Sequence, residues 1–463
     1  MLPLNELIDF CDKNIVKKDT SFYDNLSYNE RHFVALSSGD NSYNTISKSI
    51  YGKGPSSPAF KKLKKNLYQK LMFFVNGLDF DDSYQKAKSD IYKGFLSIEL
   101  LTLIGANSLI LRASKRLLNK TIRYSLHYQS ARLCQLLSSL YAVYSRDFSK
   151  GEWFHKQAMH YLLIYNREVH YLWLCNKIRA EYGRDSFSES IEEMKIYINE
   201  IKALELDSVL LNFIYLEFQF FIAYIEEDNE AQKNACYEGL EYFQSLPYHH
   251  TLGINVFTFH LLDVLYSANE LATVELIIKN QLESPHIVKG NHYYRYKEQL
   301  LRVMLYQGKV HESEMLLFGM SRKGKKLGEP FIRERIMLYE LYMAILKGER
   351  ISLRRIHYRL NKIPRSHVNI INPLMVGKVI YFMIHGEIEK AEKEVLYLTN
   401  YSKVYKSGIS ERTQSFVNYL IAFFDVRNIK VTIPPPSCIP PRHDCEIIKY
   451  DLLKEIIDKV KVM

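Results

Sequence analysis

The sequence predicts an all-α protein in which antiparallel helical hairpins stack into an extended array, an α-solenoid. Glycine and proline number only 19 and 13 in a chain of 463 residues, and β-rich folds need many of both at their turns. Turn-like segments recur about every 40 residues, and an aromatic-rich helical segment precedes most of them. A period in this range is typical of helical-hairpin repeats.

Residues 1–105 do not follow this period, and we expect them to form a helical N-terminal domain. Ser27 and Glu30 have the spacing of a capping box at the start of a helix. Further along, a helix is predicted from Phe60 to Leu71, because its apolar residues follow helical spacing. The lysines that fill the other side of this helix are Lys61, Lys62, Lys64 and Lys65.

The order of helix, turn and basic helix is that of a helix-turn-helix, whose second helix enters a DNA groove. The four lysines are therefore candidate contacts to nucleic acid. A solvated basic face is the simpler interpretation, because lysine reads base edges less well than arginine or asparagine. The net charge of +10, from 62 basic and 52 acidic residues, permits an acidic partner without requiring one.

Residues 106–428 carry the repeated pattern. Helical segments end at Gly308, Gly348 and Gly386, because glycine takes up a left-handed conformation without steric cost. Weaker copies of this turn lie near Asp147, Arg184, Asp228 and Ala268. One hairpin cannot bury its apolar face alone, so about seven hairpins should stack, with the first helix of each pair lining a concave face.

The segment Gly386-Glu387-Ile388-Glu389-Lys390-Ala391 resembles the turn between the two helices of a tetratricopeptide repeat. This resemblance implies a right-handed superhelix that acts as a scaffold for a protein or peptide. The repeats here are longer than the standard length of about 34 residues. The layout, a basic helical segment ahead of long helical repeats, resembles bacterial tetratricopeptide-like proteins that have no assigned activity.

Counting back from the turns, by analogy with that pattern, nominates five partner-binding residues on the concave face. They are Arg295, Glu298, Arg302, Arg335 and Tyr342. A bound ligand would explain charged side chains on the inner helix of a stack, and so would solvation of an open groove. A protein or peptide is the expected partner, and nucleic acid is the weaker alternative.

Motifs that would carry catalysis are missing, and we expect a protein that is not an enzyme. The sequence has no phosphate-binding Gly-x4-Gly-Lys-Ser/Thr loop, no His-Glu-x-x-His and no Gly-x-Ser-x-Gly elbow. Cys438, His443 and Cys445 are the best candidates for metal ligands, but the paired cysteine knuckles of structural zinc sites are absent. We therefore predict no metal and no cofactor.

The C-terminal part breaks the repeat. Residues 429–444 are predicted to be a proline-rich linker, because prolines such as Pro435 cannot lie inside a helix. The amphipathic residues 445–463 should form a helix that caps the last hairpin. The alternative is a detachable segment that docks in the groove or on a second protomer, as in a homodimer.

The expected location is the cytoplasm, with no membrane partner. The N-terminus lacks the basic and apolar regions of an export signal. The most apolar run, residues 210–225, contains Asn212, Glu217 and Gln219 and is too short and too polar to span a bilayer. Most of the six cysteines are widely scattered, which is typical of a reducing compartment.

Overall fold

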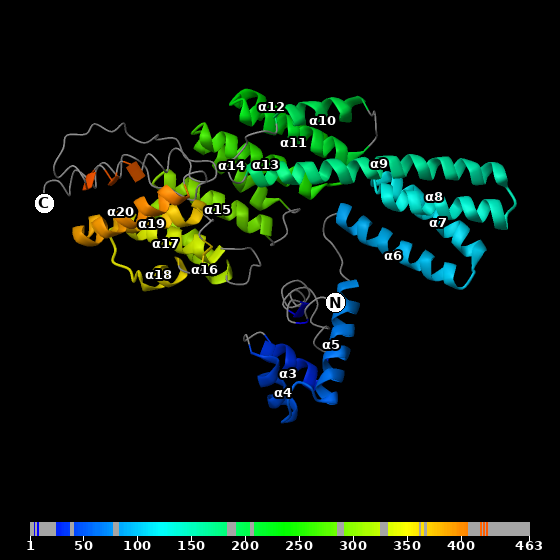
Figure 1. Ribbon diagram of the computed structural model, residues 1–463, viewed down its shortest axis with the longest axis horizontal. Coiled ribbons are helices and arrows are strands. Elements are labelled where there is room, and N and C mark those ends of the chain that lie inside the picture. The colour runs from blue at the N-terminus through cyan, green and yellow to red at the C-terminus, as the bar shows by residue number, and fades with distance from the viewer. Residues whose placement is uncertain are drawn as a thin grey trace. The chain divides into compact units, whose positions relative to one another are not determined.

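The computed structural model is shown in Figure 1. The structure describes residues 25–37, 41–76, 83–182, 191–203, 208–284, 291–324, 332–360, 363–364 and 368–405, and single positions near both ends (4, 7, 8, 417, 418, 420, 421, 423 and 424). Within these residues there are 18 α-helices, α3 to α20, and no strands. The predicted all-α class is confirmed. The chain forms two compact units, Met1–Asp81 and Asp82–Met463.

The first unit contains α3 (Tyr28–Ser37), α4 (Tyr43–Tyr51) and α5 (Pro58–Asn76). The predicted capping box begins α3, since the Ser27 N–H donates to Glu30 Oε2 at 2.7 Å. The predicted basic helix is α5, and its apolar face, which is Phe60, Leu63, Leu67 and Leu71, is buried. The rings of Phe33 and Phe60 stack with centroids 5.6 Å apart, which joins α3 to α5.

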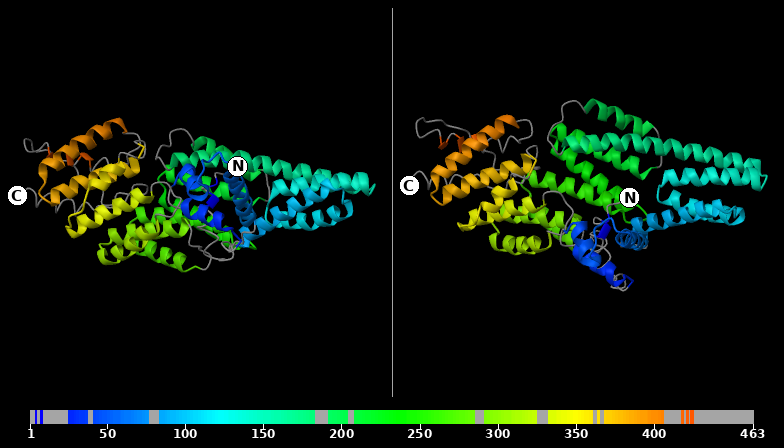
Figure 2. Two further views of the ribbon diagram at one scale, coloured as in Figure 1. Left: turned by 90° about the horizontal axis from the view of Figure 1, so that it is seen from below. Right: turned by 60° about the horizontal axis from the view of Figure 1, so that its bottom comes forward.

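The second unit is a series of helices in which most elements pack against the next one along the chain. Its helices are α6 (Ser83–Leu103), α7 (Asn107–Arg123), α8 (His127–Ser139) with the π-helical turn Leu140–Tyr144, α9 (Phe148–Tyr182), α10 (Ile191–Ala203), α11 (Val209–Ile225), α12 (Asn229–Ser245), α13 (Thr251–Ser267), α14 (Leu271–Glu283), α15 (Asn291–Tyr306), α16 (Val310–Gly324), α17 (Ile332–Lys347), α18 (Arg354–Leu360), α19 (Val368–Ile384) and α20 (Ile388–Val404). Figures 1 and 2 both show α7, α8 and α9 side by side.

The turns between these helices repeat one geometry. Gly308, Gly348 and Gly386 have φ values of 74°, 66° and 72°. After each of them, an N–H donates to a carbonyl five residues back, as from Lys309 to Met304 at 2.9 Å. This is the Schellman arrangement, which satisfies carbonyls at the end of a helix.

Three earlier turns have a left-handed residue that is not glycine. Arg146, Glu227 and Asn269 have φ values of 52°, 57° and 61°. The turns predicted near Asp147, Asp228 and Ala268 are thus confirmed, together with the three glycine turns. The turn predicted near Arg184 lies outside the described residues.

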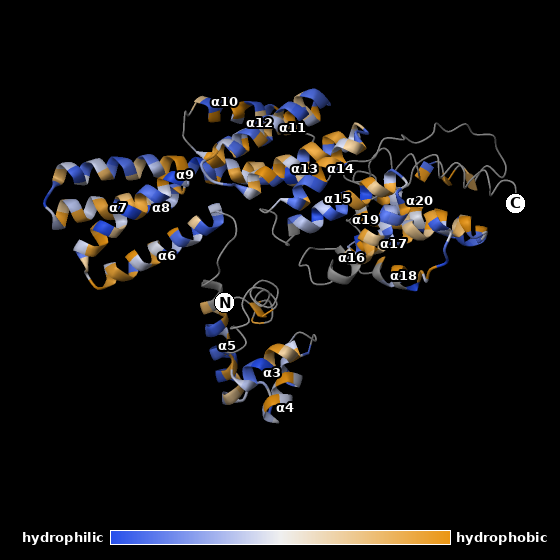
Figure 3. Cartoon of the chain, turned by 180° about the vertical axis from the view of Figure 1, so that it is seen from behind, coloured by the Kyte–Doolittle hydropathy of each residue, from blue (hydrophilic) through white to orange (hydrophobic). Residues whose placement is uncertain are grey.

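The core of the second unit consists of successive apolar clusters along the chain. Six of the eleven largest fully buried side chains of the described structure are tyrosines, so tyrosine serves here mainly to pack helices together. Apolar and polar residues share the same helices in Figure 3, as expected where one face of each helix is buried. In the described part of the chain, no helix is long and apolar enough to cross a membrane.

The predicted domain limits remain predictions. The limit expected at residue 105 falls in the turn between α6 and α7, whereas the division into compact units follows Asp81. The proline-rich linker 429–444 and the terminal helix 445–463, with Cys438, His443 and Cys445, lie outside the described residues.

Candidate functional site

The five residues predicted to bind a partner form two groups in the structure. Glu298 and Arg335 pair across α15 and α17, with Arg335 Nε 2.7 Å from Glu298 Oε1. The Tyr339 hydroxyl donates to the same oxygen at 2.9 Å. Arg295 is exposed, and its guanidinium lies 4.3 Å from the centre of the Phe259 ring. These side chains join successive helix pairs, and Arg295 is the most accessible of them.

Arg302 and Tyr342 lie inside the protein. Arg302 is 6% exposed and packs over the Tyr266 ring at 5.0 Å. Tyr342 is 1% exposed, and its hydroxyl donates to the Pro373 carbonyl at 2.9 Å. In this conformation neither side chain presents its polar end to a partner.

A buried carboxylate links three helices near the middle of the unit. Glu217 of α11 accepts hydrogen bonds from Arg179 and Cys175 of α9, with Arg179 Nε 3.0 Å from Oε1 and Cys175 Sγ 3.0 Å from Oε2. His260 Nε2 of α13 lies 3.5 Å from Oε1. Burial alone would raise the pKa of Glu217, but His260 and Arg179 outweigh it and hold the pKa below its usual value.

A cysteine beside a glutamate and a histidine has the composition of a nucleophilic site, but its chemistry here is different. Burial, together with the nearby Glu217 carboxylate, raises the pKa of the Cys175 thiol far above its usual value. The thiolate is the nucleophilic form of cysteine, so a thiol held protonated is unreactive. In this arrangement Glu217 joins α9, α11 and α13.

A second buried carboxylate makes an equivalent link. His127 Nδ1 of α8 lies 2.6 Å from Glu168 Oε1 of α9, and the Ser208 hydroxyl donates to the same oxygen at 2.6 Å. Ser208 also caps the start of α11, since its Oγ accepts from the Leu211 N–H. Glu168 and Glu217 thus connect segments about 40 residues apart, close to the period of the turns.

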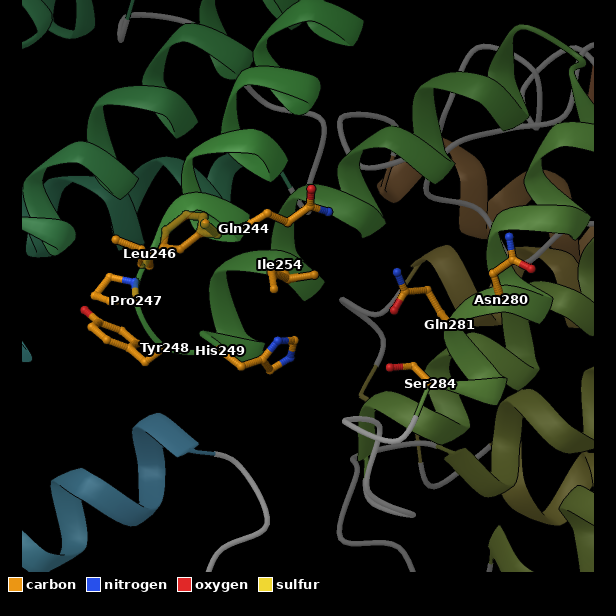
Figure 4. A pocket seen from close by; sticks show the side chains of 10 residues that line it. Gln244, Leu246, Pro247, Tyr248, His249, Ile254, Asn280, Gln281 and Ser284 are labelled. Atoms are coloured by element: carbon orange, nitrogen blue, oxygen red, sulfur yellow. The ribbon is translucent and has the colours of Figure 1, made fainter.

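A cavity of about 480 Å³ lies beside the connection between α12 and α13. It is lined by Phe243, Gln244, Leu246, Pro247, Tyr248, His249, Ile254, Asn280, Gln281 and Ser284. In Figure 4, Gln244 and the connecting residues 246–249 lie on one side of the open space. Asn280, Gln281 and Ser284, at the end of α14, lie on the opposite side. The cavity is therefore lined by three carboxamides and the Ser284 hydroxyl, together with two titratable side chains, Tyr248 and His249.

Residues far away in the sequence brace this connection. The Tyr84 ring of α6 stacks on Tyr248 with centroids 5.2 Å apart, and the Tyr124 ring lies 4.9 Å from Tyr248. The His249 N–H donates to the Ser83 hydroxyl at 3.1 Å. The start of α6 thus fixes one wall of the cavity. This site was not predicted from the sequence, because its walls come from segments that lie far apart along the chain.

The four lysines predicted to contact nucleic acid lie on α5. Lys61, Lys62 and Lys65 are exposed. Lys64 is half-buried, with its Nζ 4.6 Å from the centre of the Tyr43 ring. Three of the four lysines are therefore accessible to a partner, whereas Lys64 packs against the Tyr43 ring of α4.

Among the described residues, no group of three or more histidine, cysteine, aspartate or glutamate side chains is placed to hold a metal ion. Comparison of the chain with protein-family profiles, curated proteins and solved structures gives no match.

Proposed function

We propose that the chain is a non-enzymatic scaffold that binds an extended segment of a partner protein in the cavity beside the α12–α13 connection. The observation that carries this proposal is the set of carboxamides around the cavity: Gln244, Asn280 and Gln281. A carboxamide has one acceptor and two donors, so it matches the C=O and N–H groups of a peptide backbone. Apolar Leu246, Pro247 and Ile254 offer contacts for a side chain.

The finer architecture, a right-handed superhelix of the tetratricopeptide type, belongs to this proposal. Two observations support it: the recurring left-handed turns, and polar bonds between the first helices of successive pairs. Glu217 of α11 bonds to α9 and lies beside α13, and Glu298 of α15 bonds to α17. First helices that touch one another in series are expected in a stack of hairpins.

Site-specific crosslinking tests the peptide site. A photoreactive phenylalanine analogue would replace Gln281 in the full chain, expressed in its native host. As a matched control, the same analogue would replace Glu283, an exposed residue of α14 that does not line the cavity. We expect one partner segment, identified by mass spectrometry, to crosslink at position 281 and not at position 283.

A second variant makes the test specific. With the analogue at position 281, Gln244→Ala should reduce the crosslinked product several-fold, because the backbone of the partner loses one paired carboxamide. Equal crosslinking at both positions, or a yield that Gln244→Ala does not change, would reject the site.

A second candidate function is nucleic-acid binding by α5. Its outer face carries three exposed lysines (Lys61, Lys62 and Lys65), together with exposed Asn66 and Gln69. At 100° per residue these five positions span about 140° of the helix, a single face. Asparagine and glutamine read adenine edges, and lysine neutralises phosphate. The helix contains no acidic residue.

Fluorescence anisotropy of labelled duplex DNA tests this candidate with the full chain. Binding should weaken as salt rises, and a variant with glutamate at positions 61, 62 and 65 should lose it. Lys48→Glu, an exposed lysine on α4, is the matched control. DNA binding that is absent at low salt, or equal in the two variants, would exclude this role for α5.

A further inference from the structure

A buried lysine lies at the C-terminal end of the described helices. Lys378 of α19 has a side chain that is 3% exposed. Its Nζ lies 2.6 Å from Glu394 Oε1 of α20 and 3.3 Å from His357 Nδ1 of α18. Lysine is almost never fully buried without a partner, and here two polar partners from two other helices surround it.

This lysine lines a cavity of about 390 Å³. Small-molecule sites are typically concave, mostly apolar and from about 300 Å³ upward. The apolar and aromatic wall is formed by Leu360, Ile363, Ile371, Met375, Tyr397 and Tyr401. Lys393, an exposed residue of α20, also borders the cavity.

The polar groups of the cavity are mostly donors. An ammonium group has three hydrogens, and Glu394 and His357 account for two of those on Lys378. Burial and the nearby Lys378 lower the pKa of His357, so its ring is neutral at neutral pH. Because Nδ1 accepts from Lys378, the proton of that ring belongs on Nε2. Two lysines against one glutamate leave the cavity with an excess of one positive charge.

We propose that this cavity binds a small carboxylic acid with an apolar body. The carboxylate pairs with Lys393 and with the third hydrogen of Lys378, and the apolar body packs against Ile371 and Met375. A carboxylate accepts hydrogen bonds without donating any, which suits a donor-rich site. This ligand site is separate from the peptide site beside α12 and α13, and it does not rest on that proposal.

Isothermal titration calorimetry on the full chain tests the proposal with octanoate, octanol and octylamine, which share one chain length, and with 3-phenylpropanoate. We expect at least one of the two carboxylates to bind. Octanol and octylamine should bind about tenfold more weakly or not at all, since a charge-assisted hydrogen bond is lost.

Two variants localise the effect. Lys393→Gln, at the exposed rim, should weaken carboxylate binding about tenfold, and Lys378→Met should abolish it. Lys390→Gln, on the same helix but paired with Glu387, is the control and should bind as the wild type does. Circular dichroism melting would show whether each variant is folded. If Lys378→Met does not fold, the result for Lys393→Gln decides the test.

Three results would overturn the proposal. The first is that neither carboxylate binds. The second is that octanol binds as tightly as octanoate, which would make the site purely apolar. The third is that Lys393→Gln binds like Lys390→Gln, which would place the carboxylate elsewhere on the protein.

Discussion

Glu227 and Asn269 occupy left-handed turn positions that glycine occupies in later turns of the same chain. For most L-residues, Glu227 among them, this conformation is disfavoured by about 1–2 kcal/mol, whereas asparagine tolerates it better. Glycine avoids the cost but loses more chain entropy on folding. The turns therefore have the same hydrogen bonds but different local stability. Single substitutions can separate the two contributions.

Glu227→Gly should raise the free energy of unfolding by about 0.5 kcal/mol, since relief of the left-handed strain exceeds the added entropy cost. Gly308→Ala should lower it by about 1 kcal/mol. An added Cβ at Gly308 would meet nothing within 4 Å, so the loss would come from the backbone alone. Urea denaturation of both variants measures these changes, and a shift of both in the same direction would contradict the argument.

Glu217 is the residue whose loss should be most costly. Glu217→Ala would leave the Arg179 guanidinium without its carboxylate. Because the Arg179 side chain is 33% exposed, the free energy of unfolding should fall by about 1–3 kcal/mol, which is less than for a fully buried pair. Glu217→Gln keeps the shape and part of the hydrogen bonding, so it should destabilise less. Glu226→Ala, at an exposed ion pair with Lys195, should leave the urea midpoint near that of the wild type. Equal midpoints for Glu217→Ala and Glu226→Ala would show that the cluster is not stabilising.

The sequence marks Glu217 only as a polar interruption of its most apolar run. Its partner Arg179 precedes it by 38 residues, and nothing in the local pattern connects the two. Local patterns predicted the capping box of Ser27 and Glu30, because both groups lie within one helical turn. Bonds within a turn of helix are thus accessible to sequence reasoning, whereas bonds between helices require the fold.

Between elements, α12 and α13 approach each other through glycines. A Cβ at Gly239 would lie 2.5 Å from the Phe257 ring, and a Cβ at Gly253 would lie 2.5 Å from the Phe243 ring. Each helix therefore places an aromatic ring directly on the backbone of the other. The connection between these two closely packed helices forms one wall of the proposed peptide-binding cavity.

Gly239→Ala should lower the free energy of unfolding by about 1–3 kcal/mol, because the methyl group forces the Phe257 ring to move. Gly319→Ala is the matched control on α16, since a Cβ there would meet nothing within 4 Å. That change should stabilise by about 0.5–1 kcal/mol through helix propensity. Opposite signs in urea denaturation are expected, and a stabilising Gly239→Ala would show that α12 and α13 are less closely packed than described.

Helix faces were more predictable than cavities. The burial of Phe60, Leu63 and Leu67 on α5 follows from helical spacing alone. The wall of the peptide cavity depends on Ser83, which lies 166 residues before His249. The lysine-lined cavity likewise combines three helices. Both cavities lie between helices. The spacing of apolar residues within one helix does not show which other helices pack against it.

At the scale of the whole molecule, several carboxylates couple stability to pH. The pKa values of Glu30, Glu217 and Glu275 lie below the usual value of 4.5. In each case burial acts to raise the pKa, and basic partners outweigh it: Lys70 for Glu30, His260 and Arg179 for Glu217, and Lys279 and Lys309 for Glu275. The folded state therefore binds protons at these groups less readily than the unfolded state does.

A group with a depressed folded pKa stabilises the fold fully above its unfolded pKa, and this stabilisation is lost as pH falls through the folded pKa. The contribution of these carboxylates to the urea midpoint should thus hold down to about pH 5 and be lost below it. Because burial also lowers the pKa of His357 from its usual value of 6.5, the midpoint should begin a smaller fall already below that pH. Glu217→Gln should show a shallower fall, because one titrating group is gone. A midpoint that does not change down to about pH 3 would contradict this linkage.

The all-α class was predictable from composition and from the spacing of turns, because both are properties of the chain as a whole. The hydrogen bonds and ion pairs between residues about one period apart were not predictable. They restrict which insertions and deletions the chain can accept. Glu168, Glu217 and Glu298 each depend on a specific partner about one period away. Deleting or duplicating one hairpin would leave a buried carboxylate without its hydrogen-bond or ion-pair partner. One hairpin can therefore not simply replace another. An inserted hairpin should be tolerated only when it supplies an arginine, serine or histidine that can pair with the neighbouring carboxylate. The order of the hairpins is restricted for the same reason.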